Sequence, residues 1–261
     1  MKIKYWIIAF CAPLLIACGG ENGRPPNGDD GYTAPDPPAK INEYNLFTVE
    51  FYSRLTNESL SDGMAYDAII DHINSEKKTL FFFFDRLDAT PGQPLPLVNM
   101  AWKTGSVPFF AQHHVGAGAI EGTGIITRQL VNTYPGIYAA NRLFIAGCNV
   151  AVPLYQTNRL SLMTCRINEK AQFGWLAERE IKEAETNQIV IGTIAADLEN
   201  DFKEHLKYAL KDFRIAIHSS AQPGKNYKLF ILSPVNFVTR EVKETAVGNT
   251  PVYQCKIEYL E

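Results

Sequence analysis

The stretch 189–197, IVIGTIAAD, has the pattern of a strand whose end carries a ligand site in α/β proteins. Its β-branched residues and glycine predict a buried strand, and ligand sites of α/β sheets form where such strands end. The residues at this end are Thr193, Ile194 and Ala195, none of which binds a metal or transfers a proton near neutral pH. The pattern therefore predicts the frame of a site without the groups that usually perform its chemistry.

Two further residue patterns could do chemistry. His113 and His114 could bind a metal, but adjacent side chains usually point in different directions, and no third ligand lies near them in the sequence. The glycines that follow resemble a dinucleotide-binding fingerprint, but Glu121 replaces its third glycine and no helical pattern follows. We therefore expect no metal and no cofactor, and we expect both histidines to be loop or surface residues.

The N-terminus has the features of a secretion signal. Lys2 and Lys4 precede the apolar run WIIAFCAPLLIA, which is too short to span a bilayer. The run ends in LIAC, and small residues before such a cysteine resemble the lipobox of bacterial lipoproteins. This resemblance implies removal of residues 1–17 and a lipid, such as palmitate, on Cys18. An ordinary signal peptide with a chance cysteine is the alternative.

The remaining chain divides by composition into a tether and a domain. Residues 18–40 are rich in Pro, Gly, Asn and Asp, which predicts a disordered linker. Residues 41–261 contain no second linker and no repeat, which predicts one folded domain. Gly19 stands where an aspartate often retains lipoproteins in the inner membrane. Under that sorting rule we expect attachment to the cell envelope at the outer membrane.

The charge of the chain bears on its partners. The formal net charge is −3 at pH 7. A generic nucleic-acid-binding protein usually carries a basic excess, so the net charge does not support a nucleic acid as partner. A protein or an anionic ligand is the expected partner, and the sequence does not select between them.

Three cysteines lie in the expected domain: Cys148, Cys165 and Cys255. Residues 143–165 predict a β-hairpin with its turn near 156–158, and this register places Cys148 opposite Cys165. In an oxidising compartment the two could form a disulfide. Two buried free thiols are the alternative.

Hydrophobic patterns predict strands and helices in mixed order. Apolar runs and alternation predict strands at 44–52, 79–84, 124–128, 142–152, 159–167, 188–192, 214–219, 227–233 and 251–260. Amphipathic spacing predicts helices at 61–78, 171–185 and 197–213. This order predicts an α/β fold in which a two-layer β-sandwich is flanked by helices.

Six stretches, taken in order, resemble the endonuclease/exonuclease/phosphatase superfamily, which includes pancreatic deoxyribonuclease. TLFFFFDRLDA, GTGIITRQL and RLSLMTCRI are similar to a family strand ending in Gln-Glu, to GnailSR and to vvnTHL. IVIGTIAAD, YKLFILS and VGNTPVYQCKIEY are similar to ilaGDFN, iDyIlvS and SDHxPVxaeie. The resemblance spans nearly all of residues 41–261 and implies a four-layer α/β/β/α fold of the nuclease type.

The resemblance also implies where a catalytic site would lie. The family holds a Mg²⁺-type ion with carboxylates and amides and uses a His–Asp pair. At the matching positions this chain has Glu50 for the first-strand asparagine, Arg86 for the metal-binding glutamate, Cys165 for the histidine of THL, Thr193 and Ala195 for GDFN, Lys228 for the aspartate of iDyI, and Gly248 and Asn249 for SDH.

These replacements predict a degenerate site, because an arginine at a metal-binding position repels the ion. We therefore expect a membrane-anchored lipoprotein whose non-catalytic, nuclease-like domain acts as a binding or assembly module. A metal-dependent phosphodiesterase or endonuclease with altered residues is the alternative. Arg86, Arg128 and Lys228 would either converge to bind an anion or pair with local acids such as Asp85 and Asp88.

Overall fold

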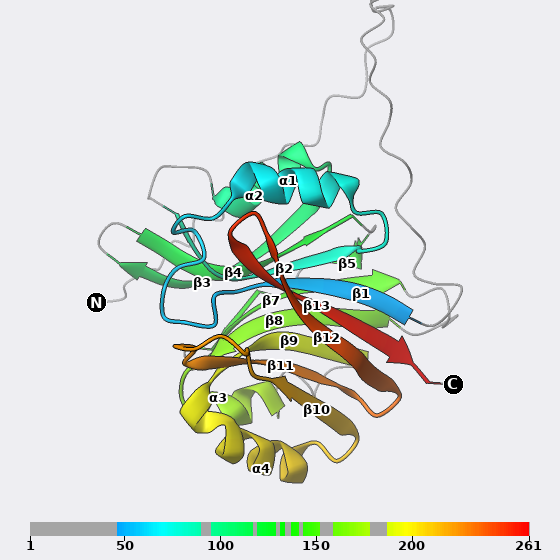
Figure 1. The fold of residues 1–261 in the computed structure, drawn as a ribbon. Coiled ribbons are helices and arrows are strands. Elements are labelled where there is room, and N and C mark those ends of the chain that lie inside the picture. Colours follow the sequence, from blue (N-terminus) through cyan, green and yellow to red (C-terminus); the bar gives the residue numbers. More distant parts are fainter. Residues whose placement is uncertain are drawn as a thin grey trace, which may run out of the picture. The chain divides into compact units, whose positions relative to one another are not determined.

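Two β-sheets lie against each other in the computed structural model, with helices on their outer faces (Figure 1). The structure describes residues 46–89, 95–116, 119–128, 131–133, 137–140, 143–151, 159–177 and 187–260, which all belong to the compact unit Asp36–Glu261. The signal predicted at 1–17, Cys18 and the linker predicted at 18–40 lie outside these residues. No helix in the described ranges has both the length and the apolarity needed to cross a membrane.

The first sheet has six strands in the order β12-β13-β1-β2-β4-β3. Their bounds are β1 Leu46–Tyr52, β2 Phe81–Ala89, β3 Val107–Gly116, β4 Ala119–Thr127, β12 Phe237–Val247 and β13 Thr250–Tyr259. β1 and β2 are parallel, whereas the other neighbours are antiparallel. The parallel pair is connected through α1, as a parallel connection requires.

The second sheet has the order β10-β11-β9-β8-β7-β5, and β6 also pairs with β7. Its strands are β5 Val131–Thr133, β6 Ile137–Ala140, β7 Leu143–Ala151, β8 Arg159–Ile167, β9 Asn187–Ala195, β10 Phe213–His218 and β11 Tyr227–Pro234. β8 and β9 form its parallel pair. Each sheet therefore has a central parallel pair and antiparallel neighbours.

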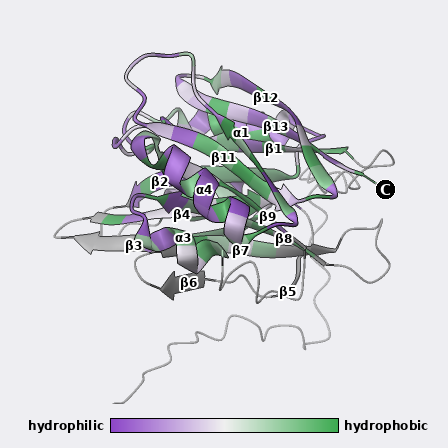
Figure 2. Cartoon of the chain, turned by 90° about the horizontal axis from the view of Figure 1, so that it is seen from below, coloured by the Kyte–Doolittle hydropathy of each residue, from purple (hydrophilic) through white to green (hydrophobic). Residues whose placement is uncertain are grey.

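Helices form the outer layers. α1 (Tyr66–Ser75) and α2 (Pro96–Lys103) contribute apolar side chains to one core with the first sheet, and α3 (Ala171–Gly174) and α4 (Glu199–Ala209) do so with the second. A 3₁₀ helix, η2 (Ala196–Leu198), precedes α4. Figure 2 shows both hydrophobic and hydrophilic residues along α4, of which Phe202 and Leu206 are buried and most charged residues are exposed.

The four-aromatic run FFFF shows why the sequence folds in this way. Phe81 and Phe83 belong to the core between the sheets, whereas Phe82 and Phe84 belong to the core under α1 and α2. Because side chains alternate across a strand, a strand covered on both faces is apolar at every position. The expected α/β/β/α sandwich is therefore confirmed.

Each predicted strand has a counterpart in the structure, but four observed strands, β3, β5, β6 and β12, were not predicted, and one register differs from prediction. Pro108 interrupts the pattern of β3, charged residues fill that of β12, and β5 and β6 are only three and four residues long. β7 and β8 pair as expected, but Cys148 lies opposite Leu162, and Cys165 lies opposite Ile145. The predicted turn near 156–158, and residues 178–185 of the predicted helix, lie outside the described residues.

The shifted register corrects the predicted pairing of Cys148 with Cys165. Cys148 packs in the core between the sheets, and Cys165 packs on the opposite face under the helices. Residues on opposite faces of a sheet cannot direct their sulfur atoms at each other. All three described cysteines, including Cys255, are buried and form no disulfide with one another.

Candidate functional site

Four strands bring polar side chains to one end of the core between the sheets. Ser53 follows β1, Asp85 lies on β2, Arg166 on β8 and Thr193 on β9. Each lies an even number of residues after an apolar residue of that core, so alternation directs it to the same interior face. All four are buried, so both sheets contribute to one polar cluster.

The Asp85 carboxylate is the centre of this cluster. Its Oδ2 accepts hydrogen bonds from Ser53 Oγ at 2.8 Å and from Arg166 Nη1 at 2.8 Å. Its Oδ1 accepts a third, longer hydrogen bond from Thr193 Oγ1 at 3.3 Å. The carboxylate is therefore neutralised by a guanidinium and solvated by two hydroxyl groups, which offsets the cost of burying its charge.

The Arg166 guanidinium is held by contacts on several sides. Its Cζ lies 3.6 Å from the centroid of the Tyr227 ring, and Nη2 donates to the backbone oxygen of Thr56 at 2.7 Å. The Tyr227 hydroxyl donates to Asn168 Oδ1 at 2.9 Å, which fixes the ring. A planar cation stacked on an aromatic face and paired with a carboxylate is a firmly positioned group.

The loop after β1 supports the cluster from one side. Ser53 Oγ accepts a hydrogen bond from the backbone N–H of Leu55 at 3.0 Å, while it donates to Asp85. The backbone oxygen of Leu55 accepts from the N–H groups of Asn226 and Tyr227. This loop therefore ties the end of β1 to the start of β11, across the two sheets.

The glycine of the stretch IVIGTIAAD is required by strand packing. A Cβ on Gly192 would lie 2.1 Å from the backbone oxygen of Cys165, which is far inside contact distance. Gly192 therefore allows β8 and β9 to lie close to each other. In their parallel register Arg166 is paired with Thr193.

Two of the positions predicted at the site are near the cluster, and the others are not. Thr193 belongs to the cluster, and Ala195 packs at the edge of the core between the sheets. Cys165 points to the helical side, and its neighbour Arg166 is the residue that enters the cluster. Glu50 lies on the outer face of the first sheet, where it contacts His72.

Two further predicted positions, Gly248 and Asn249, lie in the turn between β12 and β13. Gly248 has a φ of +59°, and Asn249 Nδ2 donates to the backbone oxygen of Gly63 at 2.8 Å. Neither residue contributes a group to the Asp85 cluster among the contacts described. They fasten this turn to the loop before α1.

The predicted anion site of Arg86, Arg128 and Lys228 does not form. Arg86 Nε lies 2.9 Å from Glu121 Oε1, and Lys228 pairs with Glu199 at the start of α4. Arg128 donates to the backbone oxygens of Glu76 and Thr79, near the start of β2, whereas Arg86 lies near the end of that strand.

The bulge in β2 explains where Arg86 points. The pairing of β2 with β4 shifts between Phe84 and Leu87, and Arg86 has a φ of +51°. A bulge re-aims the side chains that follow it, and an arginine in the left-handed region is strained. Arg86 and Lys228 therefore pair with acids, although these are Glu121 and Glu199 rather than Asp85 or Asp88, whereas Arg128 contacts backbone oxygens.

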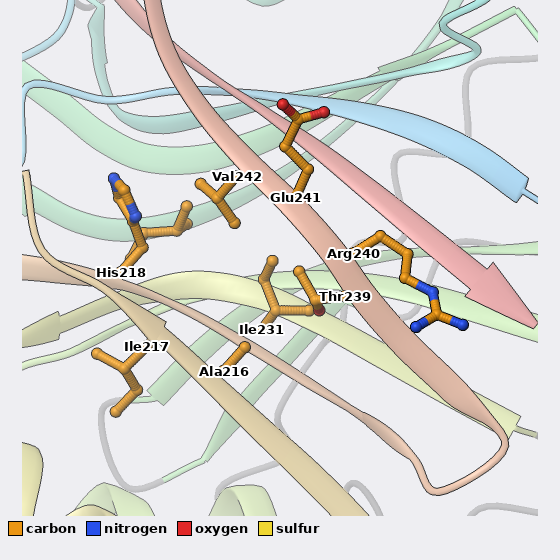
Figure 3. A pocket seen from close by; sticks show the side chains of 9 residues that line it. Ala216, Ile217, His218, Ile231, Thr239, Arg240, Glu241 and Val242 are labelled. Atoms are coloured by element: carbon orange, nitrogen blue, oxygen red, sulfur yellow. The ribbon is translucent and has the colours of Figure 1, made fainter.

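A separate groove of about 250 Å³ lies between β10 and β12, the edge strands of the two sheets (Figure 3). Ile217, Ile231 and Val242 line it, and the ring of His218 faces it from β10. The charged residues of its rim, Arg240 and Glu241, are paired with Glu258 and Lys256 on β13. The groove shares no residue with the Asp85 cluster.

Solved structures of endonuclease/exonuclease/phosphatase family proteins resemble this chain. The protein from Leptotrichia buccalis gives a TM-score of 0.60 at 12% identity, with 82% of this chain and 100% of that chain covered. The protein from Bacteroides vulgatus gives 0.59 at 9% identity, with 82% and 99% covered. The catalytic domain of human Nocturnin gives 0.54 at 10% identity, with 83% and 95% covered.

Comparisons of the amino-acid sequence, in contrast, find no similar protein or family. No family model matches the chain, and no curated protein matches it. At identities of 8–12% the likeness to solved structures concerns the fold. The described part of the chain therefore has the fold of the endonuclease/exonuclease/phosphatase proteins.

Proposed function

We propose that the chain is a membrane-anchored lipoprotein whose nuclease-type domain is non-catalytic and acts as a binding or assembly module. The observation that carries this proposal is the buried ion pair between Asp85 and Arg166, at the strand ends that the resemblance assigns to catalysis. The fold supplies the frame of a nuclease, and the ion pair takes the place of a metal-binding centre.

The chemistry of the cluster supports this proposal. A divalent ion needs oxygen ligands that carry negative charge, and here the Asp85 carboxylate already has Arg166 as its cation. An ion could bind there only after the guanidinium left, which would break a buried pair at a cost of several kcal/mol. Thr193 adds only a neutral hydroxyl group, which does not transfer a proton near pH 7.

Anchoring is the second part of the proposal. The lipobox-like LIAC motif supports a lipid on Cys18, and residues 18–40 would serve as a tether between the membrane and the domain. We place the anchor in the outer membrane on the basis of Gly19. The partner would be a protein or an anionic ligand, and the net charge of −3 gives no support to a nucleic acid.

A nicking assay tests the non-catalytic role. The full chain in detergent is incubated with supercoiled DNA and with Mg²⁺ or Mn²⁺, in the presence and absence of EDTA. We expect no cleavage above that of the Asp85→Asn variant. Cleavage that EDTA abolishes, that D85N loses and that D201N keeps would contradict the proposal and favour a phosphodiesterase. Asp201 is a suitable control because its carboxylate is half-exposed on α4.

A further inference from the structure

Three potential metal ligands meet on the outer face of the first sheet, away from the Asp85 cluster. Glu50 comes from β1, His72 from α1, and Glu76 is the capping residue directly after α1. One ligand atom from each lies within 4.8 Å of the others. His72 Nε2 lies 2.9 Å from Glu50 Oε2 and 3.0 Å from Oε1.

The local structure explains this convergence. His72 and Glu76 are four residues apart, so one helical turn places them on the same face. Glu50 lies between Val49 and Phe51 of the inner core, so alternation directs its side chain outward to α1. A fully buried carboxylate from the strand thus meets a half-buried imidazole and a half-buried carboxylate from the helix.

Hydrogen bonds from residues outside this set of three orient the carboxylates of Glu50 and Glu76. Tyr52 Oη donates to Glu50 Oε2 at 2.9 Å, and Gln254 Nε2 donates to Glu50 Oε1 at 3.1 Å. Glu76 Oε1 accepts from the backbone N–H of Lys78 at 2.7 Å. Bonds of this kind hold metal ligands in place in known sites, and each carboxylate here has at least one such bond.

The donor set has a chemical preference. We propose that Glu50, His72 and Glu76 bind a divalent transition-metal ion, of which zinc is the best match. One imidazole nitrogen and two carboxylates are a three-residue set that suits zinc and leaves a further position open. Ligand atoms about 2.1 Å from a tetrahedral zinc ion stand about 3.4 Å apart, so the 2.9 Å between His72 Nε2 and Glu50 Oε2 would widen by only about 0.5 Å on binding.

Arg128 does not take the place of the metal. Arg128 interacts electrostatically with Glu50 and Glu76, but its guanidinium donates to the backbone oxygens of Glu76 and Thr79. Its charge disfavours weakly held ions, which is a reason to expect zinc rather than Mg²⁺ or Ca²⁺. If no metal binds, the three residues form an ordinary hydrogen-bonded contact between Glu50 and His72 beside Glu76.

Calorimetric titration distinguishes these two roles. The full chain in detergent is stripped with a chelator and titrated with ZnCl₂, and the bound stoichiometry and Kd are measured. We expect one zinc ion per chain, with affinity lowered at least about tenfold in His72→Ala and in Glu76→Gln. Gln254→Leu, which removes only an outer hydrogen bond, should lower the affinity about tenfold.

Matched variants make the result decisive. His205→Ala removes a histidine that packs against Phe173 on the other side of the molecule, and it should bind zinc as the unmodified chain does. Far-UV circular dichroism checks that each variant folds, and Glu76→Gln decides the question if His72→Ala does not fold. Equal affinity in all variants, or no stoichiometric binding, would overturn the proposal. Neither result depends on nuclease activity, so this test is independent of the nicking assay.

Discussion

Arg166 Nη1 lies 2.8 Å from Asp85 Oδ2 between the two sheets, and each of these side chains is only 3% exposed. Because β2 and β8 belong to different sheets, this ion pair joins the two halves of the sandwich at one end of their common core. Ser53, Thr193 and Tyr227 enclose the pair. The ion pair is therefore a contact between the two sheets at this end of the core.

Breaking this ion pair should destabilise the domain. Arg166→Met leaves the buried Asp85 without a cation, and removal of one partner of such a pair typically costs about 3–5 kcal/mol. The double variant Asp85→Leu/Arg166→Met should lose less stability than Arg166→Met alone, because no unpaired charge remains. Urea unfolding followed by circular dichroism measures both.

An exposed ion pair is the control for this experiment. Lys170 and Asp201 pair on the surface with exposed fractions of 65% and 48%, and Lys170→Met should cost less than about 1 kcal/mol. If Arg166→Met is no more destabilising than Lys170→Met, the buried pair does not crosslink the sheets.

The three described cysteines should be unreactive in the folded domain. Cys148, Cys165 and Cys255 are buried and form no disulfide with one another, and burial raises the pKa of Cys148 and Cys255 to about 12. The thiolate is the reactive form, so iodoacetamide at pH 8 should label these residues only after unfolding. Mass-spectrometric mapping measures the labelling. A peptide pair linked through Cys148 and Cys165 would show that the register of β7 and β8 is wrong.

Alkaline pH should weaken folding through the same thiols. The ordinary pKa of a cysteine thiol is 9.0, and burial raises the pKa of Cys148 and Cys255 to about 12, so the folded chain keeps protons that the unfolded chain releases. The contribution of these two protonated thiols to the free energy of unfolding is therefore fully present below pH 9 and is lost as the pH rises towards 12. The slope approaches about 1.4 kcal/mol per pH unit for each thiol. Urea unfolding between about pH 9 and pH 10 should show a smaller slope for Cys148→Ala, and an unchanged slope would refute this account.

The proposed lipidation of Cys18 is directly testable. In a bacterial host that processes lipoproteins, the mature chain should begin at Cys18 and carry the mass of its acyl groups. Cys18→Ala should retain residues 1–17 and lose the lipid, whereas Cys11→Ala should mature normally. Intact mass spectrometry distinguishes these products. Cleavage without acylation of Cys18 would identify an ordinary signal peptide instead.

More of the fold than of the candidate site could be predicted from the sequence. Strand patterns such as 159–167 are governed by local alternation, and the sequence places this strand at the same bounds as the structure does. β12 was missed because an edge strand with one exposed face alternates polar and charged residues. Its partner β13 supplies the pairing, and no local pattern reveals that partner.

The site was harder to predict because its residues are set by register. Arg166 and Cys165 are neighbours, and a shift of one residue decides which of them faces the other sheet. Ser53 and Asp85 are ordinary residues in the sequence, and only their shared interior face brings them together. A count of alternation from Phe51 and Phe83 would have indicated both of them.

Anomalous diffraction from crystals of the domain soaked in Mn²⁺ tests the central claim most directly. We predict that Arg166 stays hydrogen-bonded to Asp85 and that no manganese peak lies at that carboxylate. A manganese ion bound to Asp85, with the Arg166 side chain displaced, would contradict the account and restore this end of the sandwich as a metal-dependent catalytic site.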